Sequence, residues 1–120
     1  MKITILGCGP SSGVPLVTGN WGECNPDNPK NFRSRPSIVI EQDEFRILID
    51  TSPDLRMQLL RNNVQSVDAV LYTHEHADHV MGIDDLRGMW RQRGQLIDVF
   101  GPADVLQSLK NRFGYLFKDV

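Results

Sequence analysis

The first half of the chain carries short apolar segments of the kind that form β-strands. Residues Lys2 to Leu6 alternate and include β-branched side chains, which predicts a strand. Ser37 to Glu41 and Phe45 to Asp50 are apolar runs separated by three polar residues, and they predict a β-hairpin. Residues 7–31, between these strands, are rich in Gly, Pro and Asn, which predicts a long loop. Loops of this length inside a compact domain are usually functional or disordered.

Strands and helices alternate in the rest of the chain. A helix is predicted after Thr51, with Ser52 as its cap and Pro53 at its first position, and it should stop near Asn62. A hairpin followed by alternating strands and helices predicts an α/β fold with a mixed sheet. The remaining predicted elements are a buried strand at 67–72, a helix from 79 to about 91, a strand at 96–100 and a helix from 102 to about 117.

Every histidine of the chain lies in the turn that follows the strand at 67–72. His74 and His76 are two residues apart, and Asp78 and His79 follow where the next helix should begin. In extended backbone, residues i and i+2 project to the same side, so two imidazoles can reach one ion. In open α/β sheets, binding sites form at the carboxyl ends of the strands. The position of the turn therefore suits a functional site.

The residue types of this turn indicate a metal site. Imidazole suits zinc and other borderline metals, and a carboxylate adds a harder oxygen ligand. A mixed nitrogen and oxygen set holds an ion and leaves a position for water, as a hydrolytic site requires. Packing alone gives no reason to gather three imidazoles in six residues, so we expect metal binding rather than coincidence.

Composition restricts the classes of partner. The 120 residues are the size of one domain, with 40% apolar residues, 23% charged residues and a net charge of -2. The balance argues against a nucleic-acid surface, which would be basic, but it permits a small anionic substrate. No apolar stretch approaches the roughly 18 residues of a membrane helix. Cys8 and Cys24 are read as free thiols, and the chain is expected in the cytoplasm.

Two features near the N-terminus remain open to more than one interpretation. Gly7 to Gly13 follows a strand, but its third glycine is one residue late for a dinucleotide fingerprint and prolines interrupt the expected helix. A glycine-rich turn is therefore favoured over a nucleotide cradle, and the loop can also border a site. Arg33 and Arg35 suit either a phosphate contact or a solvated loop end.

The histidine turn and several flanking segments resemble a known family. "THEHADH" resembles the H-x-H-x-D-H signature of the metallo-β-lactamase superfamily. The flanking segments are similar to its phosphoribosyl cyclic phosphodiesterase-like branch. They are "GCGPSSGVP" at 7–15, "RSRPSIVIE" at 33–41, "ILIDTSPDLR" at 47–56 and "GIDDLR" at 82–87.

The resemblance implies a fold and a ligand set. That family's fold is a four-layer αββα sandwich, so this chain would be the N-terminal half of one, an α/β mixed sheet with helices on one side. Its members bind two metal ions, usually zinc, alternatively manganese. By similarity, His74 and His76 would belong to the first site, and Asp78 and His79 to the second. Asp50 matches an aspartate that orients the metal-binding turn from outside, although a strand-end or helix-capping role is an equal alternative.

The resemblance also implies chemistry. A metal-bound hydroxide would attack a small phosphodiester substrate, and Asp78 would be the catalytic residue of this turn. Ester or thioester hydrolysis by the same hydroxide is an alternative. Two others are a non-catalytic remnant or metal-binding interaction module, and an RNA-processing nuclease of the same fold.

One departure from the family pattern limits these expectations. The family completes its two sites with later histidines and a bridging aspartate, whereas this sequence has no histidine after His79. We therefore interpret residues 1–120 as a single partial domain that lacks its C-terminal half, and expect catalysis only if that half is supplied. Half a sandwich exposes an apolar sheet face, which predicts a homodimer or pairing with the missing half. The substrate-binding residues are not predicted.

Overall fold

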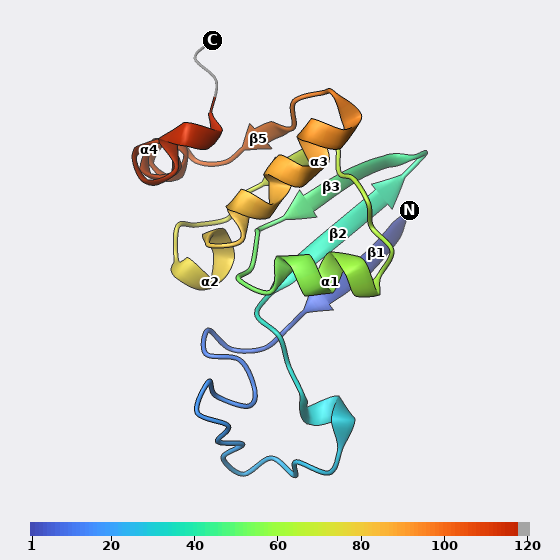
Figure 1. Cartoon of the computed structure of the whole chain (residues 1–120), viewed down its shortest axis with the longest axis vertical. Coiled ribbons are helices and arrows are strands. Elements are labelled where there is room, and N and C mark those ends of the chain that lie inside the picture. Colours follow the sequence, from blue (N-terminus) through green and yellow to red (C-terminus); the bar gives the residue numbers. More distant parts are fainter. Residues whose placement is uncertain (118–120) are drawn as a thin grey trace.

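The computed structural model describes residues 1–117, which form one mixed sheet with helices on one side (Figure 1). The five strands lie in sequence order across the sheet. The first two pairs are antiparallel and the last two are parallel. This confirms the predicted mixed α/β sheet. The strands are β1 (Lys2–Gly7), β2 (Ser37–Gln42), β3 (Phe45–Ile49), β4 (Ala69–Leu71) and β5 (Asp98–Phe100).

The helices are shorter and more numerous than the sequence pattern predicts. The α-helices are α1 (Leu55–Arg61), α2 (Ala77–Val80), α3 (Leu86–Arg93) and α4 (Ala103–Arg112). Three 3-10 turns accompany them: η1 (Pro29–Asn31), η2 (Ile83–Asp85) and η3 (Gly114–Leu116). None of the helices within residues 1–117 has the length and apolarity needed to cross a membrane. The domain prediction for 1–120 extends over residues 118–120, which lie outside the described part.

The prediction of one helix from 79 to about 91 is wrong, because the chain breaks at Gly82. The Gly82 N–H donates to the Thr51 carbonyl at 3.0 Å instead of continuing a helix. A Cβ at Gly82 would lie 1.9 Å from the Ser52 carbonyl oxygen. Only glycine fits this contact, so α2, η2 and α3 replace the single helix.

The predicted start of α1 and the predicted end of α4 are also wrong, whereas α1 stops near Asn62 as predicted. α1 begins at Leu55, later than predicted. Ser52 Oγ accepts from the Asp54 N–H at 3.1 Å, as a capping side chain would, but Pro53 and Asp54 form a turn rather than the first residues of the helix. The Ser52 hydroxyl donates to Gln58, and Arg35 donates to the Asp54 carboxylate. α4 ends at Arg112, and the following residues form the 3-10 turn η3 rather than a helix to about 117.

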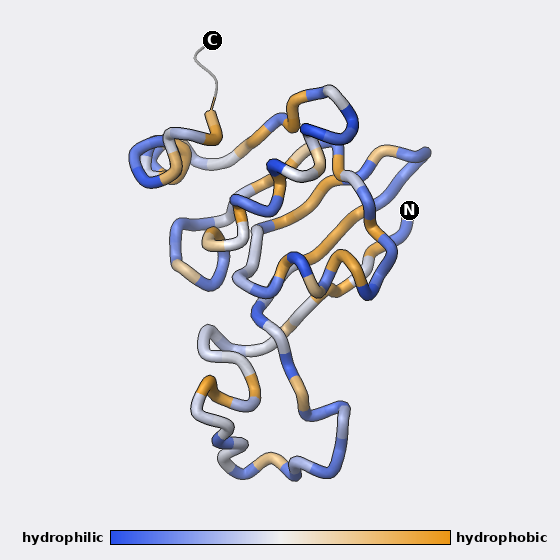
Figure 2. The backbone as a smooth tube through the Cα atoms, viewed as in Figure 1, coloured by the Kyte–Doolittle hydropathy of each residue, from blue (hydrophilic) through white to orange (hydrophobic). Residues whose placement is uncertain are grey.

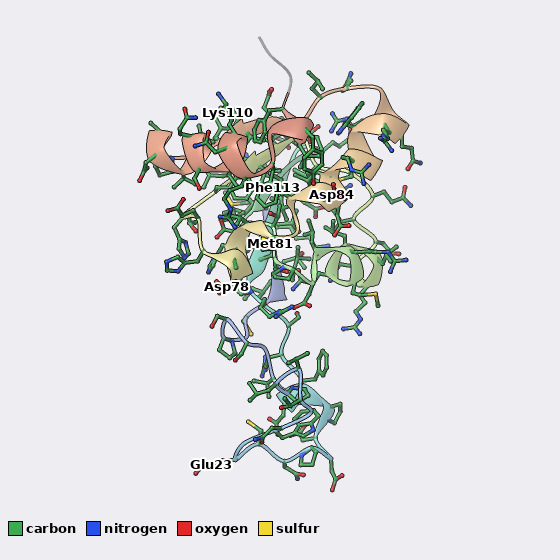
Figure 3. All side chains as sticks on the ribbon, turned by 60° about the vertical axis from the view of Figure 1, so that its left-hand side comes forward. Glu23, Asp78, Met81, Asp84, Lys110 and Phe113 are labelled. Carbon is green, nitrogen blue, oxygen red and sulfur yellow. The ribbon has the colours of Figure 1, made fainter. Side chains whose placement is uncertain are left out.

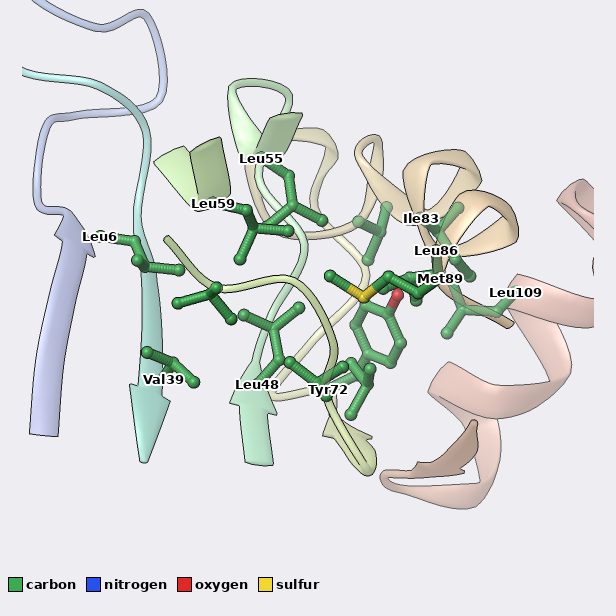
Figure 4. Close-up of a cluster of buried hydrophobic side chains, with 14 of the residues drawn as sticks. Leu6, Val39, Leu48, Leu55, Leu59, Tyr72, Ile83, Leu86, Met89 and Leu109 are labelled. Carbon is green, nitrogen blue, oxygen red and sulfur yellow. The ribbon is translucent and has the colours of Figure 1, made fainter. Parts of the chain in front are cut away.

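One hydrophobic core joins the sheet to the helices (Figure 4). Val39 and Leu48 point from β2 and β3 toward Leu55 of α1, and all three are fully buried. Leu109 brings α4 onto the same core. In Figure 2 the tube is most hydrophobic along β2 and β3. These strands supply the buried centre, whereas the loop at 8–36 extends away from it (Figure 1).

The opposite face of the sheet is apolar and has no covering layer within residues 1–117. Strand register places Ile5, Ile38, Ile49, Leu71 and Phe100 in one row across all five strands. A second row contains Ile3, Ile40 and Ile47. Of these residues Ile3, Ile5, Leu71 and Phe100 are exposed.

Candidate metal centre

The histidine turn is anchored where β4 ends, between β3 and β5. The Tyr72 N–H donates to the Phe100 carbonyl at 2.8 Å. The buried Tyr72 hydroxyl lies 2.9 Å from Thr51 Oγ1, and Thr51 also donates to the Val80 carbonyl. Burial raises the pKa of Tyr72, so the phenol stays protonated as a hydrogen-bond partner. Both ends of the turn are therefore tied to the segment after β3.

Asp50 is the main polar support beneath the turn. It follows β3 with a left-handed φ of 62°, a conformation that Asp tolerates better than most residues. Its buried carboxylate accepts from the Thr73 N–H at 2.8 Å and the Thr73 hydroxyl at 2.6 Å. The carboxylate also pairs with His79 Nδ1 at 2.7 Å. One side chain thus contacts both the start and the end of the turn.

The structure brings the three imidazoles together. The ring centroids of His74 and His76 are 4.6 Å apart, and those of His74 and His79 are 4.0 Å apart. Asp78 lies beside this group, with its Oδ2 3.3 Å from His79 Nε2. In Figure 3, Asp78 projects from α2 at the edge of the domain next to the long loop. All four predicted ligands and Asp50 therefore belong to one cluster.

An ion in this cluster could be bound either by Asp50 together with His79 or by Asp78 together with His79. Ligand atoms of Asp50, His74 and His79 all lie within 4.8 Å of one another. However, two atoms bound to one zinc ion at about 2.0–2.2 Å in tetrahedral geometry lie roughly 3.4 Å apart. The 2.7 Å between Asp50 and His79 Nδ1 is shorter than this and is a hydrogen-bond distance.

The pair formed by Asp78 and His79 Nε2 fits an ion better. Its separation of 3.3 Å matches the expected spacing of two ligands on one metal. The donor chemistry, imidazole nitrogen with carboxylate oxygen, also suits zinc or manganese. We therefore place Asp50 behind His79 and keep His74, His76, Asp78 and His79 as the predicted ligands.

Two side chains near the site were not predicted from the sequence. Thr73 lies between Asp50 and His74, with its hydroxyl 2.8 Å from His74 Nδ1. Arg112, at the end of α4, donates to the Glu75 carbonyl at 3.1 Å, and its other terminal nitrogen lies 3.6 Å from Met81 Sδ. A threonine before the first histidine was a visible signal for the former. Nothing in the sequence signals the second contact, which spans 37 residues.

Arg35 is committed to a structural contact. Two nitrogens of its side chain donate hydrogen bonds to the Asp54 carboxylate, at 2.7 and 3.1 Å, and its backbone N–H donates a third at 2.8 Å. Arg33 instead lies exposed, with one nitrogen 3.3 Å from Cys8 Sγ. Arg35 is therefore not available for a phosphate contact, and a phosphate contact of Arg33 stays a prediction.

Comparisons with known proteins agree with the fold and the motif. The family profile of the beta-lactamase superfamily domain matches residues 45–120. A PhnP-family diphosphatase structure is 38% identical with a TM-score of 0.89, covering 96% of this chain and 46% of that one. The structure of Zn²⁺-bound PqqB from Methylobacterium extorquens is 26% identical with a TM-score of 0.78, covering 100% of this chain and 44% of that one.

Curated relatives match over a smaller share of their length. An octanoyltransferase from Porphyromonas gingivalis is 42% identical over 98% of this chain but only 24% of that protein. A ribonuclease Z from Methanococcus maripaludis is 25% identical over 95% of this chain and 33% of that protein. The chain thus spans a third or less of these two relatives and under half of the two solved structures. From the family profile, the fold and the histidine turn together, the chain belongs to the metallo-β-lactamase superfamily.

Proposed function

We propose that this chain carries part of the site of a metal-dependent hydrolase that acts on phosphodiesters. The observation that carries the proposal is the spacing of Asp78 Oδ2 and His79 Nε2, which suits two ligands of one ion. His74 and His76, from the preceding turn, would hold a second ion. The proposed ion is Zn²⁺, alternatively Mn²⁺, with two ions in a complete site.

The chain's own residues would prepare this site. His74 and His79 are held by hydrogen bonds on one nitrogen each, which fixes their rings. Asp78 would contribute the only negative charge among the four proposed ligands. Divalent ions bound there would supply activation of water and neutralisation of the charge that develops during phosphodiester hydrolysis.

The similar proteins support phosphorus chemistry over other hydrolytic reactions. The diphosphatase structure and the ribonuclease Z relatives both carry names of phosphate-ester or phosphoanhydride hydrolysis. Zinc is supported by the Zn²⁺-bound PqqB structure. The octanoyltransferase name applies to a protein of which the match covers only 24%, so it gives little support to acyl chemistry here. A small phosphodiester is therefore the proposed substrate, acted on in the cytoplasm.

RNA processing is the second candidate. Ribonuclease Z proteins recur among the relatives, although the net charge of -2 disfavours a nucleic-acid surface on this chain. A small substrate is preferred because RNA binding needs a basic surface, which would have to lie outside these 120 residues. A non-catalytic metal-binding module remains the third candidate, since the sequence contains no later histidine.

The partner proposed for this chain would cover the apolar sheet face. Ile3 is 60% exposed and Ile5 is 64% exposed, and both lie on the edge strand β1, at one end of the rows formed by strand register. A homodimer or pairing with a C-terminal half would remove this surface from water.

One assay separates the three candidates. The protein is produced from its native gene, loaded with Zn²⁺ or Mn²⁺, and given a cyclic phosphodiester, a thioester and a structured RNA. We expect hydrolysis of the cyclic phosphodiester, lost in Asp78→Ala and kept in Glu75→Ala. Cleavage of only the RNA supports the nuclease. Metal uptake without any cleavage supports the binding module and contradicts the hydrolase.

A further inference from the structure

A single hydroxyl proton lies between the buried carboxylate and the first histidine of the turn. Thr73 Oγ1 is 2.6 Å from Asp50 Oδ2 and 2.8 Å from His74 Nδ1. A threonine hydroxyl donates one hydrogen bond and accepts others, whereas a carboxylate only accepts. The two contacts therefore cannot be assigned independently.

The assignment follows from the carboxylate. Because Asp50 cannot donate, the Thr73 proton must lie on the 2.6 Å contact with Asp50. The Thr73 oxygen is then an acceptor toward His74, so His74 must carry its proton on Nδ1. The reverse assignment would place two oxygen acceptors 2.6 Å apart with no proton between them. His74 consequently presents an unprotonated Nε2.

Asp50 positions a proton on His79 by direct contact. His79 Nδ1 lies 2.7 Å from the same Asp50 oxygen, so this nitrogen carries the proton and Nε2 faces Asp78. One carboxylate therefore places a proton on Nδ1 of two histidines, of His79 by direct contact and of His74 through Thr73. The two histidines are those assigned to different ions in the proposed function.

We propose that Thr73 is a positioning residue. Its hydroxyl links Asp50 to His74 in a hydrogen-bond relay, which holds a proton on His74 Nδ1 and leaves His74 Nε2 as the metal-binding nitrogen. This inference rests on the proposed function for its purpose, but the tautomer itself is a property of the metal-free chain. Thr73 is exposed, and its backbone N–H also bonds to Asp50, so loss of the hydroxyl leaves the backbone anchor in place.

Long-range ¹H–¹⁵N NMR of the metal-free protein, above pH 8 where ordinary imidazoles are neutral, reads the tautomers directly. We expect His74 in the Nδ1–H form in the wild type and in Thr73→Ser, which keeps the hydroxyl. In the isosteric Thr73→Val, His74 should shift toward Nε2–H. His79 should keep its Nδ1 proton in all three proteins, which serves as an internal control and shows that the turn is intact.

Metal affinity is the second readout. Competition with a chromophoric chelator should show Zn²⁺ binding weakened about tenfold in Thr73→Val and restored in Thr73→Ser. An Nε2–H His74 in the wild type, or an unchanged His74 in Thr73→Val, overturns the relay. A correct tautomer pattern without Zn²⁺ binding by the wild type keeps the relay and contradicts the proposed function instead.

Discussion

At the scale of single residues, Asp50 supports the site because its carboxylate accepts from three donors at once. In Asp50→Asn the amide tolerates the left-handed backbone, but its NH₂ group cannot accept from Thr73 or His79. We expect Zn²⁺ affinity to fall about 10–100-fold, measured by chelator competition. Asp43→Asn is the matched control, because Asp43 is exposed and also has a positive φ, of 51°. Equal affinity in both variants would contradict the role of Asp50.

A second residue, Asp54, makes stability depend on pH. Partial burial tends to raise the pKa of Asp54, but the hydrogen bonds from Arg35 outweigh it and hold the pKa below its usual value. A depressed folded-state pKa stabilises the fold above the unfolded pKa of about 4 and loses that contribution as pH falls further. Asp54→Asn should therefore lower the free energy of unfolding by about 1 kcal/mol at pH 7.

Urea unfolding at pH 7 and pH 3 measures this effect. The difference in unfolding free energy between wild type and Asp54→Asn should narrow at the lower pH, because the Asp54 carboxyl group of the unfolded wild type then takes up a proton that the folded state binds less readily. A gap of the same size at both values would show that the charge on Asp54 contributes nothing.

At the scale of elements, the break between α2 and η2 depends on Gly82. In Gly82→Ala the new Cβ would lie 1.9 Å from the Ser52 carbonyl oxygen and 3.0 Å from Leu55 Cβ, so backbone must move. We expect a loss of roughly 1–3 kcal/mol or more in unfolding free energy. Gly88→Ala is the control, because a Cβ there meets no heavy atom within 4 Å among residues 1–117.

In the control variant Gly88→Ala, the free energy of unfolding should rise rather than fall. Gly88 lies inside α3, where alanine is preferred to glycine by roughly 0.5–1 kcal/mol, so Gly88→Ala should stabilise. Thermal unfolding of the two variants measures both changes. Similar stability of the two variants would mean that the contact of Gly82 with Ser52 does not break the helix.

The elements also show what the sequence can predict. Alternation with β-branched residues located β1, apolar runs located β2 and β3, and the turn residues located the histidine cluster. The helix break was missed because the atom that excludes a side chain at Gly82 lies 30 residues earlier. The link from Asp50 to Thr73 depends on the parallel pairing of β3 with β4, and the Arg112 contact on how α4 packs. Such contacts between distant residues leave no local pattern.

At the scale of the whole molecule, the uncovered sheet face should drive association. Ile5 is 64% exposed in a row of apolar residues that crosses all five strands. We expect the 120-residue chain to self-associate, and Ile5→Lys to shift it toward monomer, because the charge would have to be desolvated in the contact. Light scattering after size-exclusion chromatography measures the mass.

Leu60→Lys is the control for this prediction. Leu60 is 59% exposed, similar to Ile5, but lies on α1, on the other side of the sheet. The variant Leu60→Lys should therefore show the same distribution of molecular mass as the wild type. A wild-type chain that is monomeric and unfolds cooperatively would contradict an association through the sheet face.

The most direct test of the central claim, a divalent-metal site in the histidine turn, is a Zn²⁺ titration of the chain. The wild type should bind at least one ion. His76→Ala and Asp78→Ala should each weaken binding by more than the roughly 10–100-fold cost of losing an outer partner. Glu75→Ala, in the same turn but outside the proposed ligand set, should bind as the wild type does. Unchanged affinity in His76→Ala and Asp78→Ala, or no binding by the wild type, would contradict the claim.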